Sequence, residues 1–230
     1  MLINYSDAPG KYRNGSDYYF EAKGFKFEIT KDAIDANADL VRQYDFIWLP
    51  DNDLAISTNK INALFHLCRD YNLELAQPAV RNNFVTHTTT IRRPHCILRY
   101  VNFVELMCPM FSKASLFQVL DTFKLNRSEF GIDWIWAERL KSKRIAIIDA
   151  VNVYHCKKVF SGEYYKKLRA LGISQKDESS EIFRKFGLQP HYEEYGRVFK
   201  PWAKMSGFIG TSGITERVLL KYQSWYYGWD

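Results

Sequence analysis

The chain has 230 residues, of which 47% are hydrophobic and 16% aromatic, a composition that predicts a folded globular protein and not a disordered one. Its formal net charge of +6 favours anionic partners such as nucleotide diphosphates or acidic membrane surfaces, whereas the absence of a long basic run argues against nucleic acid. The four cysteines are far apart and form no C-x-x-C pair, which predicts reduced thiols in a cytoplasmic protein. No apolar run approaches the ~18 residues that a membrane helix needs, so we expect the protein to be attached at most peripherally to the inner face of a membrane.

Strands and helices alternate along the first two-thirds of the chain, which predicts an α/β fold with a sheet flanked by helices and ligands at the carboxyl ends of strands. Apolar residues at a helical period support the helix that we place at Asn59–Tyr71. The expected elements, in order, are strands at Met1–Tyr5 and Tyr18–Ala22, a helix at Thr30–Val41, a strand at Phe46–Leu49, the helix at Asn59–Tyr71, a strand at Leu73–Ala79, helices at Ser112–Leu125 and Gly131–Leu140, and one bent strand or two strands at Ile145–His155.

The remaining sequence is polar and charged from Lys157 to about Arg197, and it predicts helical pieces at Glu163–Leu171 and Ser179–Phe186. We therefore divide the chain into a core at residues 1–158 and an α-rich, aromatic-rich extension at residues 159–230 that packs on it. The strand at the start of the chain has no lead-in, which suggests that a first strand is missing.

The segment YDFIWLPDNDLAIS, Tyr44 to Ser57, contains a short apolar strand that is followed, after Pro50, by Asp51, Asn52 and Asp53. Two carboxylates one residue apart repel each other unless a cation lies between them, and Mg²⁺ or Mn²⁺ suits oxygen ligands of this kind. A D-x-D triplet also arises by chance, and Asp and Asn are common turn residues. Because the triplet follows an apolar strand, we expect a divalent-metal site that holds a diphosphate.

Other polar groups lie at strand ends or helix starts. Asp7 follows the first strand, His155 ends a late strand, and Asp133 begins a helix, where it also suits a simple N-cap. Glu105 lies in an apolar run and could be a buried acid paired with an arginine. Together they predict one mechanism: Asp53 and His155, with Asp51 directly or through water, hold the metal, and Asp133 or Glu105 is a base for an acceptor hydroxyl.

A second polar cluster combines His87 with Arg92 and Arg93. It suits either a contact with a phosphate or an acidic sugar, or a solvated loop.

The segments YDFIWLPDND, LELAQPA, RYVNFVELMCPMFS, GIDWIWAERL and AVNVYH, in this order, resemble an uncharacterised domain-of-unknown-function family of bacteria and plants. Its plant members are often labelled lysine-ketoglutarate reductase trans-splicing related. The resemblance covers most of residues 1–158. This family in turn is similar to glycosyltransferases of the GT-A fold, a Rossmann-like domain with a mixed sheet that binds nucleotide-sugars.

The resemblance implies roles for the same residues. Asp51 and Asp53 match the D-x-D motif that binds Mn²⁺ or Mg²⁺ and, with Asn52 between them, the donor diphosphate. His155 matches a late histidine that completes the metal shell, and Asp133 matches the acceptor base of inverting members. Asp7, after the early strand, matches the acid that commonly contacts the nucleoside, and Glu105 lines the acceptor side by position. The chain departs from the pattern in its missing first strand and in Ile132, which stands where acceptor motifs often carry a second acid.

The leading expectation is therefore a metal-dependent glycosyltransferase that moves a sugar from a nucleotide-sugar donor to a glycan or lipid-linked glycan acceptor, as in surface polysaccharide synthesis. One alternative is a GT-A-like protein that only binds a glycan or nucleotide. A phosphatase that uses a D-x-D nucleophile is a weaker alternative, because Ala55 stands where such motifs carry Thr or Val.

Overall fold

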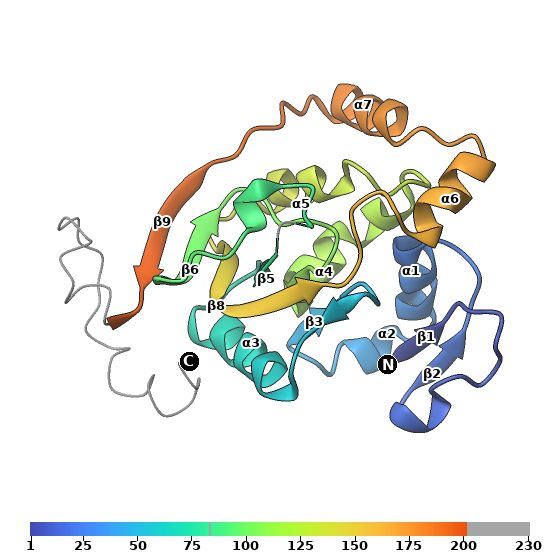
Figure 1. Cartoon of the computed structure of the whole chain (residues 1–230), viewed down its shortest axis with the longest axis horizontal. Coiled ribbons are helices and arrows are strands. Elements are labelled where there is room, and N and C mark those ends of the chain that lie inside the picture. Colours follow the sequence, from blue (N-terminus) through green and yellow to red (C-terminus); the bar gives the residue numbers. More distant parts are fainter. Residues whose placement is uncertain (83, 202–230) are drawn as a thin grey trace.

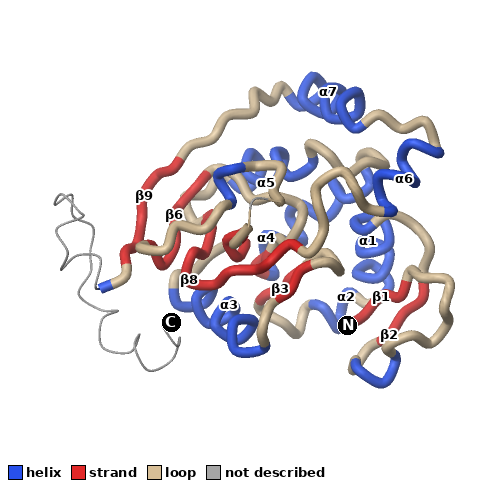
Figure 2. Tube along the Cα trace, viewed as in Figure 1, coloured by secondary structure: helices blue, strands red, loops and turns tan. Residues whose placement is uncertain are grey.

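The structure is a computed structural model that describes residues 1–82 and 84–201. Its centre is a seven-stranded mixed sheet, drawn in red in Figure 2. The strands lie side by side in the order β3 (Phe46–Trp48), β7 (Met110–Ser112), β5 (Leu75–Val80), β8 (Ile145–His155), β6 (Cys96–Val101) and β9 (Glu194–Phe199), and β4 (Leu54–Ala55) pairs with β8 outside this path. The expected α/β class with a mixed sheet is confirmed.

Strand directions bring three chain segments together at the carboxyl ends of β3, β5 and β8, which we call the carboxyl edge of the sheet. Strands β5 and β8 are parallel, and β3 runs in the same direction because both β3 and β5 are antiparallel to β7. The residues that follow β3 and β5 and the last residue of β8 therefore meet at the same edge. Asp51 and Asp53, Asn82, and His155 occupy these positions.

Helices cover both faces of the sheet (Figure 1). Helices α1 (Lys26–Ala36), α4 (Lys113–Val119) and α5 (Ile132–Leu140) pack on one face together with the short 3-10 helix at Leu120–Lys124. Helix α3 (Thr58–Asp70) packs on the other. Strand β8 serves both apolar cores, because successive side chains of a strand point to opposite faces.

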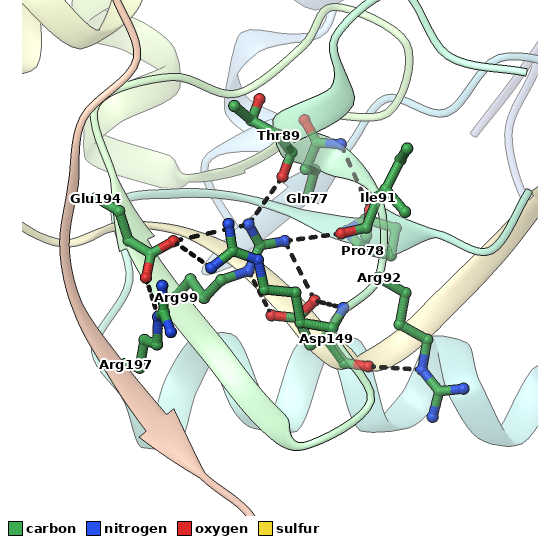
Figure 3. A network of polar contacts seen from close by, with 10 residues as sticks. Gln77, Pro78, Thr89, Ile91, Arg92, Arg99, Asp149, Glu194 and Arg197 are labelled. Atoms are coloured by element: carbon green, nitrogen blue, oxygen red, sulfur yellow. Dashed lines mark hydrogen bonds and ion pairs between the residues drawn. The ribbon is translucent and has the colours of Figure 1, made fainter. Parts of the chain in front are cut away.

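A bulge in β8 sets the register of the carboxyl edge. Pro78 of β5 pairs with Ile148, but the next residue, Ala79, pairs with Asn152, so residues 149–151 form an extra loop in β8. Proline cannot donate a ladder hydrogen bond and is found at such irregularities in central strands. The bulge turns Asp149 toward Arg99 of β6, and Figure 3 shows the network of polar contacts around this buried ion pair.

The amino-terminal segment forms a separate small sheet. Strands β1 (Leu2–Asn4) and β2 (Tyr19–Glu21) are parallel and pair only with each other within the described residues. They lie beside α1 and the short helix α2 (Ala38–Val41), and a 3-10 turn at Arg13–Gly15 connects them. The strand expected at Met1–Tyr5 is thus present as β1, but it is not a strand of the central sheet.

The segment after β8 runs through α6 (Glu163–Ala170) and α7 (Gln175–Phe186) and then returns as β9 at the edge of the sheet (Figure 1). We call residues 163–193 the strap. Both expected helices are found, and β9 adds a strand that the sequence did not predict. Gly131, with a positive φ of 92°, lets α7 approach closely, since an added Cβ would lie 3.3 Å from Ile182. The part of the expected aromatic-rich extension beyond residue 201 lies outside the described residues.

No helix in residues 1–82 and 84–201 combines the length and the apolar character that a membrane crossing requires.

Candidate functional site

Asp53 and His155 face each other at the carboxyl edge of the sheet. The short strand β4 pairs with the end of β8 so that Leu54 lies opposite His155, and the carbonyl of Asp53 accepts a hydrogen bond of 2.9 Å from the backbone of Cys156. His155 Nε2 lies 3.5 Å from Asp53 Oδ1, and the two side chains are 12% and 19% exposed. The pair is therefore held by backbone pairing and remains accessible from solvent.

The imidazole of His155 has a fixed orientation. Its Nδ1 lies 2.6 Å from the carbonyl oxygen of Phe84, which can only accept, so Nδ1 carries a proton and Nε2 faces Asp53. Asn82 bonds both backbone groups of His155, with distances of 3.1 Å to its N–H and 2.8 Å to its carbonyl. The hydrogen bond with Asp53 raises the pKa of His155, and the same bond lowers the pKa of Asp53.

Asp51 has a protein partner that the sequence did not predict. Lys26, at the start of α1, lies 2.7 Å from Asp51 Oδ1 and also bonds the carbonyls of Leu106 and Met107. The backbone N–H of Asp51 donates to Met107 at 2.9 Å. Burial raises the pKa of Asp51, and Lys26 opposes that shift. Asp51 thus joins α1 to the 105–109 loop.

Glu105 and Asp133 are two buried carboxyl groups on the α5 side of this site. They are 6% and 3% exposed. The pKa of Glu105 is raised to about 8, chiefly by burial and also by the charges of Asp133 and Asp51, while His155 opposes the rise. Burial also raises the pKa of Asp133 to about 7, against hydrogen bonds from the backbone N–H of Leu106 and from backbone N–H groups around the start of α5. Asp51, Asp133 and His155 therefore lie close enough to Glu105 to act on it electrostatically.

Two tyrosines of the strap lie beside this site. The phenol groups of Tyr165 on α6 and Tyr192 after α7 lie near the site, and burial, together with neighbouring carboxylates, raises the pKa of each to about 12. Tyr192 also packs on Trp134, with ring centroids 5.3 Å apart, and Trp134 directly follows Asp133. The side chains of the strap and of α5 together form an aromatic wall beside the two carboxyl groups.

Asp7 lies away from these groups. Its side chain is fully exposed and pairs with Lys23 at 2.6 Å, which lowers its pKa. The amino-terminal segment reaches the site through Tyr5 instead, whose hydroxyl accepts a hydrogen bond from Asn52. The structure thus brings Asp51, Asp53, Glu105, Asp133 and His155 together, and places Asp7 outside that group.

Sequence reasoning missed three residues that hold the site. Asn82 follows β5 at the carboxyl edge, and this position is a signal that could have identified it. Lys26 and Tyr5 carry no such signal, because their contacts join segments 25 and 47 residues apart.

The chemistry of Asp53 and His155 fits a hard divalent cation in part. A carboxylate oxygen and an imidazole nitrogen whose Nδ1–H bonds a carbonyl are common metal ligands. Within the described residues, no group of three His, Cys, Asp or Glu side chains is arranged to hold a metal. The pair therefore suits an ion that takes its other ligands from phosphate oxygens and water, as Mg²⁺ usually does.

None of the curated proteins compared with the chain matches it. A family model described as "Protein of unknown function (DUF707)" matches residues 35–100, a segment that runs from the end of α1 to β6 and includes Asp51, Asn52 and Asp53. The expected resemblance to an uncharacterised family is thus confirmed: through residues 35–100 the chain is similar to the DUF707 family of proteins of unknown function.

Proposed function

We propose that the chain is a metal-dependent glycosyltransferase that moves a sugar from a nucleotide-diphosphate sugar to a glycan or lipid-linked glycan. The observation that carries this proposal is the Asp53–His155 pair at the carboxyl edge of the sheet, with the imidazole oriented by Phe84 and Asn82. In open α/β sheets this edge is where ligands bind. The GT-A likeness of the sequence supports the same assignment.

Asp53 and His155 are the residues that would hold Mn²⁺ or Mg²⁺ with the donor diphosphate. When bound, such an ion neutralises negative charge on a leaving diphosphate. Asp51 would act through Lys26, which its carboxylate holds against the 105–109 loop. Asn52 stays a candidate for direct contact with the diphosphate, because its side chain is exposed next to the pair.

The two buried carboxyl groups suit different roles at neutral pH. Glu105, with a pKa of about 8, is mainly protonated, whereas Asp133, with a pKa of about 7, is ionised to a large extent. A general base works best when its pKa is near the operating pH, so Asp133 is the better base for an acceptor hydroxyl. Because both are covered, we expect Tyr192 and Trp134 to move when an acceptor binds.

The test is a panel of UDP-, GDP- and TDP-sugars with Mn²⁺, in which donor binding is measured by calorimetry and donor hydrolysis by release of the nucleotide. We expect at least one donor to bind only with metal, and Asp53→Ala and His155→Ala to abolish that binding. Asp45→Ala is the matched control, because Asp45 is exposed at the opposite end of β3. Metal-dependent binding without turnover would favour the binding protein instead. Unchanged binding by Asp53→Ala would refute the proposed site.

A further inference from the structure

Three basic side chains gather where β5 ends beside the bulge of β8. The backbone N–H of Arg81 donates to Val153 at 2.8 Å, and that of Arg92 donates to Val80 at 2.9 Å, which places the two arginines on adjacent segments. Lys60, in the first turn of α3, donates to the side chain of Asn152 at 3.2 Å. We call Lys60, Arg81 and Arg92 the cationic cluster.

The charge of this cluster is not balanced by carboxylates. None of its three members forms an ion pair in the part of the chain that the structure describes. The buried acid Asp149 bonds Arg99 and the backbone of Arg93 with its carboxylate, and offers Arg92 only its backbone carbonyl, at 3.3 Å from Nε. Figure 3 shows this contact, with no contact drawn to the terminal nitrogens of Arg92.

The pKa of Lys60 also shows that the charges of the cluster repel one another. Partial burial lowers the pKa of Lys60, and the charges of Arg92 and Arg81 lower it further. Three like charges in one place cost free energy unless an anion lies among them. Neighbouring Arg93 provides a contrast, because Glu194 lies 3.0 Å from its guanidinium.

The kind of anion follows from the donors. Two guanidinium groups and one ammonium group match the oxygens of a phosphate group, to which arginine can donate two parallel hydrogen bonds. The first turn of α3 adds a positive helix end near Lys60. We propose that the cationic cluster is a binding site for a phosphate group, borne either by a soluble ligand or by a lipid headgroup.

This site is distinct from the Asp53–His155 pair but borders it. Arg81 directly precedes Asn82, which bonds the backbone of His155, so the two sites share the chain segment after β5. No metal and no sugar donor enters the argument. The phosphate site therefore stands or falls separately from the glycosyltransferase proposal.

The experiment measures binding of inorganic phosphate and pyrophosphate to the full chain without metal, by calorimetry, and binding to phosphatidylcholine vesicles with and without phosphatidic acid. We expect saturable phosphate binding that Arg81→Ala and Lys60→Ala each weaken roughly tenfold, which corresponds to about 1.4 kcal/mol. Arg81 is exposed, so its variant should fold, and Arg92→Lys tests the third position while it keeps the charge. Arg69→Ala, on the same helix as Lys60, is the control.

Binding of phosphatidic acid vesicles that is lost in Arg81→Ala would identify a lipid headgroup as the source of the phosphate. Phosphate binding without vesicle binding would identify a soluble ligand. The proposal is overturned if neither probe binds saturably, or if the Lys60→Ala/Arg81→Ala double variant binds phosphate as tightly as the unaltered chain.

Discussion

The buried carboxyl group of Glu105 should make the protein less stable as the pH rises, and Glu105→Gln should remove this effect. The pKa of Glu105 is raised from 4.5 in the unfolded chain to about 8 in the folded chain, first by burial. Between these values the folded state binds more protons than the unfolded state, so the free energy of unfolding falls as pH rises. The stabilising contribution is complete below about pH 4.5 and lost above about pH 8.

The size of the effect follows from the shift. At 1.36 kcal/mol for each pKa unit, a rise from 4.5 to about 8 corresponds to about 5 kcal/mol. Part of it comes from the charge of Asp133, so we expect Glu105→Gln to stabilise the protein by about 3 to 5 kcal/mol near pH 9. Near pH 5 the variant should lie within about 1 kcal/mol of the unaltered protein, because Glu105 Oε2 has no hydrogen-bond partner within the described residues and the amide occupies an equivalent position.

The assay is urea unfolding at a series of pH values, followed by circular dichroism, for the unaltered protein, Glu105→Gln and the control Glu138→Gln. Glu138 is exposed on the same helix as Asp133, so its variant should follow the unaltered protein at every pH. If the curves of Glu105→Gln and the unaltered protein run parallel from pH 5 to pH 9, the carboxyl group is not buried as described and the reasoning fails.

Two further substitutions test other parts of the structure. Arg99→Met leaves Asp149 as a buried charge without its partner and should reduce the free energy of unfolding by about 3–5 kcal/mol, whereas Arg99→Met/Asp149→Leu should recover much of this loss. Urea unfolding checks both, and a loss below about 1 kcal/mol for the single variant would mean that water reaches the carboxylate. Asn82→Ala frees the backbone of His155 and should weaken Mn²⁺-dependent donor binding about 10- to 100-fold. Calorimetry measures this, and unchanged affinity would count against a positioning role.

The parts of the fold that the sequence predicted are those with a local signal. The apolar run before Asp51 and the helical period at Asn59–Tyr71 correspond to β3 and α3. Strand β6 was missed because Arg99 interrupts its apolar sequence, and the buried arginine forms its ion pair with a residue 50 positions later. Strand β9 was missed because its charged residues suit an exposed edge and give no apolar pattern.

The residues of the candidate site also fall into those that the sequence could predict and those that it could not. Asp53 and His155 could be predicted because each lies at a strand end, and parallel strands bring such positions together. The partner of Asp51 could not be predicted, since Lys26 reaches Asp51 only after α1 has packed against the 105–109 loop. Asp7 follows a strand as predicted, but that strand belongs to the small separate sheet, and so the rule for the central sheet does not apply to it.

The position of β9 has a consequence for synthesis of the protein. Strand β6 pairs on one side with β8, and its other side is completed only by residues 194–199. During translation β6 therefore leaves the ribosome about a hundred residues before its second partner. Until then its unpaired N–H and C=O groups are open to pairing with other chains, a known route to aggregation. We expect nascent chains that end before β9 to depend on chaperones, even though every residue of the candidate site has by then been made.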